Sequence, residues 1–66
     1  MGFETKVLSI VADILEDDRS AGFCNGSMFV DCSARQATVI KRKLLDQLSC
    51  DIMVSRASSE YAFDFV

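Results

Sequence analysis

Cysteine thiols and carboxylates are the side chains in this 66-residue chain that could do covalent, acid–base or metal chemistry. Cys24, Cys32 and Cys50 stand at irregular spacing without a C-x-x-C pair, and the chain contains no His. A zinc site normally takes four thiolate or imidazole ligands, and an odd thiol count does not fit a disulfide framework. We therefore interpret the cysteines as small apolar side chains in a reducing cytosol. Cys24, in a predicted exposed loop, lacks the neighbouring His that commonly activates a nucleophilic thiolate.

The carboxylates give no firmer indication of catalysis. Asp31 and Asp64 are the best candidate pair for acid–base work, but no apolar pocket is evident that would separate their pKa values. Asp13, Glu16 and Asp17 have helical spacing that would make, at best, a weak site for a hard cation. We therefore expect a protein that is not an enzyme and that uses no metal and no cofactor.

Charge is distributed unevenly along the chain. Residues 1–33 carry a net charge of −4 and residues 34–66 a net charge of +1, which together give −3. Glu16, Asp17 and Asp18 follow one another where the first predicted helix ends, a place where carboxylates oppose the helix dipole. This acidic end is solvated and partly neutralised by Arg19, or it follows a helix that stops before Glu16, or it is a recognition patch for a basic protein surface.

A second charged group lies on the second predicted helix. Arg35, Arg42 and Lys43 fall on the outer side of that helix, whereas Lys41 flanks its apolar stripe. They form a solvated helix surface, a contact surface for nucleic acid, or a contact surface for an acidic partner. The net negative charge and the lack of aromatic residues interleaved with basic ones argue against nucleic acid, which remains the alternative.

Apolar spacing predicts the elements that position these groups. A helical period begins at Phe3, and we expect this helix to end between residues 16 and 21, with Gly22 available as a left-handed cap. Ser33 and Gln36 form a capping box that predicts a second helix over residues 34–48. Residues 27–32, 51–56 and 61–66 are rich in strand formers, and residues 57–60 have the length and polarity of a hairpin loop.

The order α-β-α-β-β predicts a single α+β domain over residues 1–66, with two helices on one face of a three-stranded, mostly antiparallel sheet. We favour the order 1-3-2, in which the last strand lies in the centre, because its aromatic residues give the densest apolar side. The alternative pairs strands one and two in parallel and leaves strand three at an edge.

The pleat of these strands would turn one set of side chains away from both helices. Phe29 and Met53 would be exposed there beside Asp31 and Asp64. Such side chains are either ordinary surface scatter or the centre of an interface for a protein partner or a second copy of the chain.

These observations predict a small protein-binding or regulatory module, comparable in composition to phage-type inhibitors and accessory proteins. Binding would involve the uncovered sheet face and the acidic helix end, through Phe29, Asp31, Met53, Asp64, Glu16, Asp17 and Asp18. No run of about 18 apolar residues is present and the N-terminus does not resemble a signal peptide, so we expect a cytoplasmic protein without a membrane span.

Overall fold

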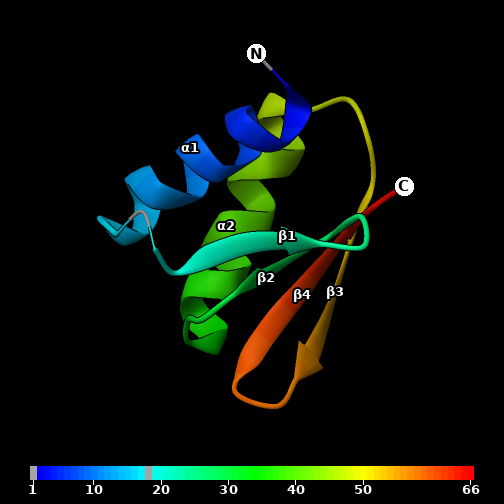
Figure 1. The fold of residues 1–66 in the computed structure, drawn as a ribbon. Helices are drawn as coiled ribbons and strands as arrows, with labels where there is room; N and C mark the ends of the chain where they lie inside the picture. The colour runs from blue at the N-terminus through cyan, green and yellow to red at the C-terminus, as the bar shows by residue number, and fades with distance from the viewer. Residues whose placement is uncertain (1, 18) are drawn as a thin grey trace.

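The computed structural model describes residues 2–17 and 19–66 as an α+β domain with two helices and four strands. The elements are α1 (Phe3–Leu15), β1 (Ala21–Cys24), β2 (Ser27–Val30), α2 (Ala34–Gln47), β3 (Ile52–Ala57) and β4 (Glu60–Phe65). Both helices lie on the same side of the sheet, and the opposite side has no helix over it (Figure 1). The expected α+β class and single-sided helix layer are confirmed.

The sheet has four strands in the order β1-β2-β4-β3, and all neighbours are antiparallel. The expectation of three strands was therefore wrong. Residues 21–24, expected to be loop, form β1 and pair with β2 at the edge of the sheet. β4 lies between β2 and β3, so no two neighbouring strands are parallel.

Turn chemistry explains why β1 forms. The strands β1 and β2 are joined by Asn25 and Gly26, which have φ values of 53° and 84°. Positive φ at both positions is the pattern of a type I′ turn, whose twist matches that of a two-residue hairpin. The pair β3 and β4 is joined by Ser58 and Ser59, of which Ser58 has φ 58°, as expected for the first position of a type II′ turn.

The helix boundaries follow from their caps. Ser33 Oγ accepts the Gln36 backbone N–H at 3.2 Å, and Gln36 Oε1 accepts the Ser33 N–H at 3.0 Å, so the predicted capping box is confirmed. Helix α1 ends at Leu15, earlier than expected, because Glu16 turns left-handed with φ 55° and ψ 35°. The N–H groups of Glu16 and Asp17 both reach the Ala12 carbonyl, which closes the helix without Gly22.

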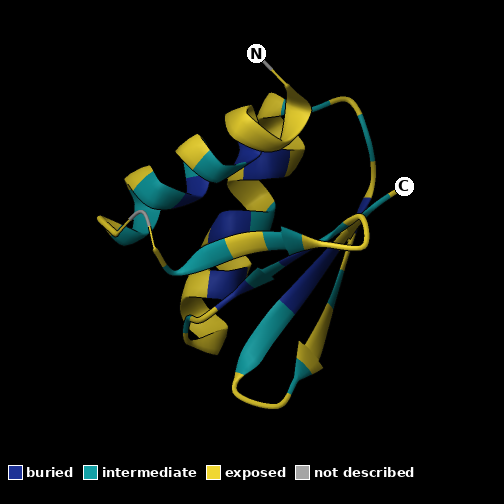
Figure 2. Ribbon diagram, in the orientation of Figure 1, coloured by how far each residue is buried: buried dark blue, intermediate teal, exposed yellow. Residues whose placement is uncertain are grey.

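The core lies between the helices and the sheet (Figure 2). Its fully buried side chains come from the inner stripe of each helix and from alternate strand positions, namely Val7, Val11, Met28, Val30, Ile40, Leu44 and Phe63. Phe65 extends this core with an aromatic cluster. The centroid of its ring lies 5.2 Å from that of Phe3, in an edge-to-face arrangement, and 6.1 Å from that of Phe23, in a stacked arrangement. Phe23 thus fixes β1 onto the same core.

The chain folds as two similar α-β-β halves. Each half places a helix beside its own hairpin, and the buried Val7 and Val11 of α1 occupy the places that Ile40 and Leu44 occupy in α2. The halves meet along the antiparallel pair β2 and β4, where Phe29 lies opposite Ala62. Around that pair the register is symmetric, since Met28 faces Phe63 and Val30 faces Tyr61. The domain therefore has an approximate internal twofold axis at the Phe29–Ala62 pair.

Candidate functional site

The side of the sheet without helices is the first candidate for a binding surface, and we call it the open face. Strand alternation and the pairing register give its residues, which are Gly22, Cys24, Ser27, Phe29, Met53, Ser55, Ala57, Glu60, Ala62 and Asp64. Asp31 follows β2, and its N–H donates to the Ser20 carbonyl at 2.8 Å, which continues the β1–β2 ladder by one pair. The strand register therefore places Phe29, Met53 and Asp64 on one sheet face, and Asp31 lies just beyond the end of β2.

Phe29 occupies the centre of the open face. Its cross-strand partner Ala62 is only 7% exposed, yet Ala62 is not part of the core cluster on the helix side. Side chains of the open face, with half-buried Phe29 the largest of the neighbours, therefore cover the small Ala62. This gives the face a locally apolar centre that is partly withdrawn from water.

Met53 lies on β3, two strands away from Phe29, and is 65% exposed. Two strand spacings correspond to about 10 Å, so the two side chains lie on either side of β4 and do not form one continuous contact. Asp64 lies between them in the ladder, opposite both Ser27 and Met53. The Ser27 hydroxyl donates a hydrogen bond to Asp64 Oδ1, which orients that carboxylate on the open face.

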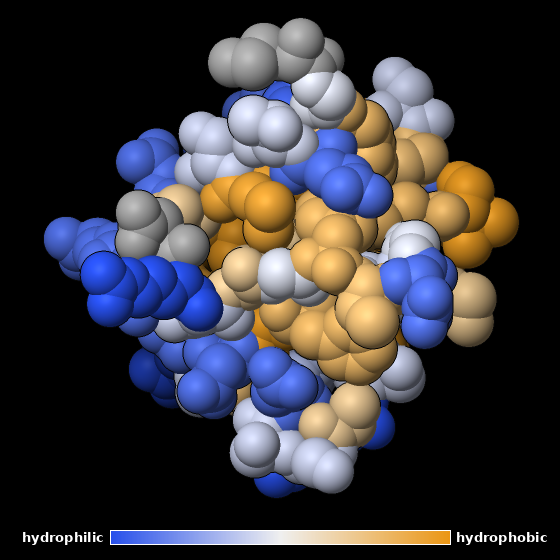
Figure 3. Space-filling model, in the orientation of Figure 1, coloured by the Kyte–Doolittle hydropathy of each residue, from blue (hydrophilic) through white to orange (hydrophobic). Residues whose placement is uncertain are grey.

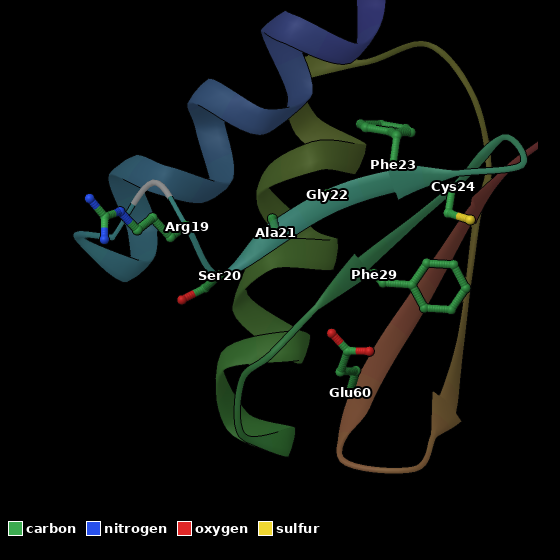
Figure 4. Close-up of a pocket in the computed structure, with 8 residues that line it drawn as sticks. All are labelled: Arg19, Ser20, Ala21, Gly22, Phe23, Cys24, Phe29 and Glu60. Carbon is green, nitrogen blue, oxygen red and sulfur yellow. The ribbon is translucent and has the colours of Figure 1, made fainter.

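A hollow of about 520 Å³ lies beside Phe29 where β1 twists away (Figure 4). Its lining includes Ser20, Gly22, Cys24 and Glu60, with Cys24 and Phe29 on the side of the strands opposite to Phe23. Gly22 contributes because it has no side chain to fill the space beside Phe29, its partner in the ladder. The hollow gives the open face a concave part into which a partner's apolar side chain would fit.

The charges of the open face have one sign. Asp31, Glu60 and Asp64 carry carboxylates there, and within strands β1 to β4, all of them described, no Lys or Arg occupies an open-face position. Arg19 lines the hollow at its margin, but its guanidinium extends away from the strands (Figure 4). In the view of Figure 3, apolar surface gathers over the middle of the molecule, with hydrophilic side chains around it.

The acidic end of α1 is not part of the open face. Asp17 lines a separate hollow with α1 residues and Ala21, on the helix side of β1. Its carboxylate accepts hydrogen bonds from the Arg19 backbone N–H and the Ser20 hydroxyl, both at 2.9 Å, and these bonds lower its pKa. Glu16 is the left-handed cap, and Asp18 lies outside the described residues. Asp17 therefore shapes the turn that leads into β1.

The basic residues of α2 occupy two different surfaces. Arg42 and Lys43 line a shallow hollow on the outer side of the helix, with Val39 and Asp46. Arg35 is exposed on the first turn of α2 and lines neither this hollow nor the groove between α2 and β3. Because Asp46 shares the hollow of Arg42 and Lys43, and Arg35 does not line it, the three predicted nucleic-acid contacts do not form an uninterrupted basic surface.

Sequence reasoning missed a groove between α2 and the edge strand β3, which we call the α2–β3 groove. It encloses about 570 Å³ and is lined by Ala34, Ala37, Thr38, Lys41, Arg42, Leu45, Val54 and Tyr61. Leu45 is large and apolar, yet it is 41% exposed. An apolar residue next to Leu44 of the core stripe is the signal in the sequence that could have indicated a second apolar stripe on this helix.

The cysteines are free thiols in the described structure. Cys24 is exposed beside the hollow of the open face, whereas Cys32 is half-buried, and burial together with the nearby Asp31 charge raises the pKa of its thiol. In residues 2–17 and 19–66, no three His, Cys, Asp or Glu side chains come close enough to hold a metal ion. Neither described helix has both the length and the apolar character needed to cross a bilayer.

Comparison with known proteins gives no relative: the chain matches no protein-family model, no curated protein and no solved structure. The surfaces described above are therefore the basis for a function.

Proposed function

We propose that this chain is a protein-binding module that recognises a basic, partly apolar surface of another protein through its open face. The observation that carries the proposal is the combination of Met53, 65% exposed, and half-buried Phe29 on a helix-free sheet face whose strand positions carry only acidic charges. Aromatic and Met side chains are enriched at the centres of interfaces, and a single sign of charge favours a partner of the opposite sign.

The charge of the open face also bears on self-association. A twofold dimer built on this face would bring the carboxylates of Asp31, Glu60 and Asp64 near their own copies. Like charges facing each other across an interface disfavour it. The open face is therefore better suited to a basic partner than to a second copy of the chain.

The second candidate function is nucleic-acid binding through Arg35, Arg42 and Lys43. It is favoured by one observation, which is that Arg42 and Lys43 line the same hollow on the outer side of α2. Such binding would weaken steeply with salt, because phosphate contacts release counterions.

Photo-crosslinking separates the two candidates. A benzophenone amino acid is placed at Met53 in one variant and at Lys43 in another, and both are irradiated in cells. We expect the Met53 variant to give protease-sensitive, nuclease-resistant adducts whose yield falls when Phe29→Ser is added. Adducts that form only from Lys43 and are destroyed by nuclease would favour the second candidate, and absence of adducts at Met53 would contradict the first.

A further inference from the structure

The α2–β3 groove lies on the helix side of the sheet and is separate from the open face. Its apolar lining consists of Ala37 and Leu45 from α2 with Val54 and Tyr61 from the strands. Leu45 is exposed and Val54 and Tyr61 are only half-buried, so this apolar surface is available to solvent. The groove therefore has the composition of a site that receives apolar side chains.

The strand that borders this groove has a free edge. β3 is the last strand of the sheet, and Ala57 pairs with Glu60 across a two-residue turn. The Val66 N–H donates to the Asp51 carbonyl at 2.9 Å, at the other end of the same ladder. Because antiparallel partners alternate between bonded and non-bonded pairs, the backbone groups of Val54 and Arg56 point away from β4. Val54 thus offers both a side chain in the groove and free backbone groups at its border.

The charged side chains around the groove are cationic. Lys41 and Arg42 line it, and the Arg56 guanidinium lies 5.9 Å from the centroid of the Tyr61 ring. No carboxylate is among the described residues that line the groove. An occupant that carries acidic side chains would therefore meet opposite charge on both sides of the apolar surface.

The other half of the domain provides an internal comparison. The equivalent groove between α1 and β1 encloses about 320 Å³ and is lined by Thr5, Leu8, Ser9, Ala12, Asp17 and Ala21. Leu8 and Ser9 stand where α2 has Lys41 and Arg42, and Ala12 and Ala21 stand where Leu45 and Val54 stand. Of these two equivalent grooves, the one in the second half is the larger, and it is the one whose lining includes Lys and Arg.

We infer that the α2–β3 groove binds an extended segment of a partner protein in which every second residue, on the side that faces the groove, is apolar or acidic. The segment adds to β3 as a fifth strand, its apolar side chains enter the groove, and its carboxylates meet Lys41, Arg42 and Arg56. Backbone hydrogen bonds to Val54 and Arg56 supply affinity that does not depend on sequence. A second copy of β3 is a poorer occupant because it would bring the same cations together.

The test begins with selection of a random peptide library, displayed on phage, against the folded protein. We expect enriched peptides of about seven residues in which the alternate positions that face the groove are apolar or acidic. Labelled peptides should bind in fluorescence anisotropy with a dissociation constant on the order of 10 µM, typical of a small transient interface. Arg42→Glu and Arg56→Glu should each weaken binding about tenfold, whereas Ser9→Glu in the equivalent groove of α1 should not.

Backbone pairing has its own readout. On peptide binding, the amide protons of Val54 and Arg56 should exchange more slowly with solvent, while those of Ala21 and Phe23 at the opposite edge should not change. A peptide methylated at the backbone nitrogens that face β3 should lose binding. Circular dichroism of each variant controls for folding.

Several results would overturn the inference. In the selection, these are the absence of enriched peptides or the enrichment of basic sequences. In the binding assay, it is an affinity that does not change with Arg42→Glu and Arg56→Glu. In the exchange experiment, it is the absence of protection at the Val54 and Arg56 amides. Binding of an oligonucleotide that is lost in the same two variants, without any peptide binding, would assign the cations to nucleic acid. Concentration-dependent self-association that is abolished by Arg56→Glu would assign the edge to a second copy.

Discussion

Replacing Glu16 by Gly should stabilise this domain. Glu16 caps α1 in the left-handed conformation, with φ 55° and ψ 35°, where the Cβ of an L-residue lies close to the following carbonyl oxygen. Relief of that crowding should raise the free energy of unfolding by about 1 to 2 kcal/mol. The greater conformational freedom of Gly in the unfolded chain should lower the free energy of unfolding by about 0.4 to 1 kcal/mol. Loss of a carboxylate that opposes the helix dipole adds about 0.3 kcal/mol.

The net gain is about 1 kcal/mol in the free energy of unfolding, which corresponds to a rise in Tm of about 4 to 8 °C for a domain of this size. Thermal unfolding followed by circular dichroism measures it. Glu16→Gln is the matched control, because it removes the charge and keeps the backbone strain, so it should raise Tm by about a quarter as much or less. Its effect should also disappear in about 1 M salt, whereas the effect of Gly should remain. Equal shifts for Gly and Gln, or a lower Tm for Gly, would refute the argument from strain.

The other predictions concern turns, caps and titrating groups. Ser58→Gly should stabilise the domain by about 1 kcal/mol, because Gly accepts the positive φ of 58° at the first position of the turn, and a lower Tm would contradict this assignment. Ser33→Ala should lower the free energy of unfolding by about 1 kcal/mol through loss of the capping box, measured by urea titration; an unchanged midpoint would mean that the cap contributes nothing. Cys24 should react with a disulfide reagent faster than Cys32, and the raised pKa of Cys32 should shift its reaction to higher pH; equal rates at neutral pH would argue against burial of Cys32. Asp17→Asn should lower Tm at neutral pH, because the ionised carboxylate accepts two hydrogen bonds in the folded state. The difference in Tm from wild type should vanish as the pH falls through the lowered pKa of Asp17, where the carboxylate becomes protonated. A pH-independent difference would show that the charge of Asp17 is irrelevant.

The sequence was most informative where local chemistry decides the structure. Ser33 and Gln36 can cap a helix in only one way, and the residues that follow contain no Gly or Pro, so the start of α2 was predictable. The alternation of aromatic with small or acidic side chains in residues 61–66 likewise predicted that Tyr61, Phe63 and Phe65 face the helices. In these segments, propensity, periodicity and capping all favour the same conformation.

The missed strand and the early end of α1 have a common origin. Residues 21–24 contain Gly22 and are too short to show alternation, so they resemble a loop, yet Asn25-Gly26 favours a two-residue hairpin that requires a strand before it. Gly22 was also the obvious candidate for a left-handed cap, whereas the cap is Glu16, which rarely adopts that conformation. The Phe29–Ala62 pairing and the α2–β3 groove depend on register and helix placement, which no local pattern encodes.

The repetition of the α-β-β half has a consequence for how the chain is held together. Only residues 31–33 connect β2 to α2, and the β2–β4 ladder and the helix contacts that join the halves are non-covalent. A half of this length, on its own, leaves one hairpin edge and the inner side of its helix in water and is too small to bury a core. Each half therefore needs a complementary half, which can come from the same chain or from a second one. At high concentration two chains can exchange halves and rebuild the same domain twice, as a domain-swapped dimer with every ladder intact.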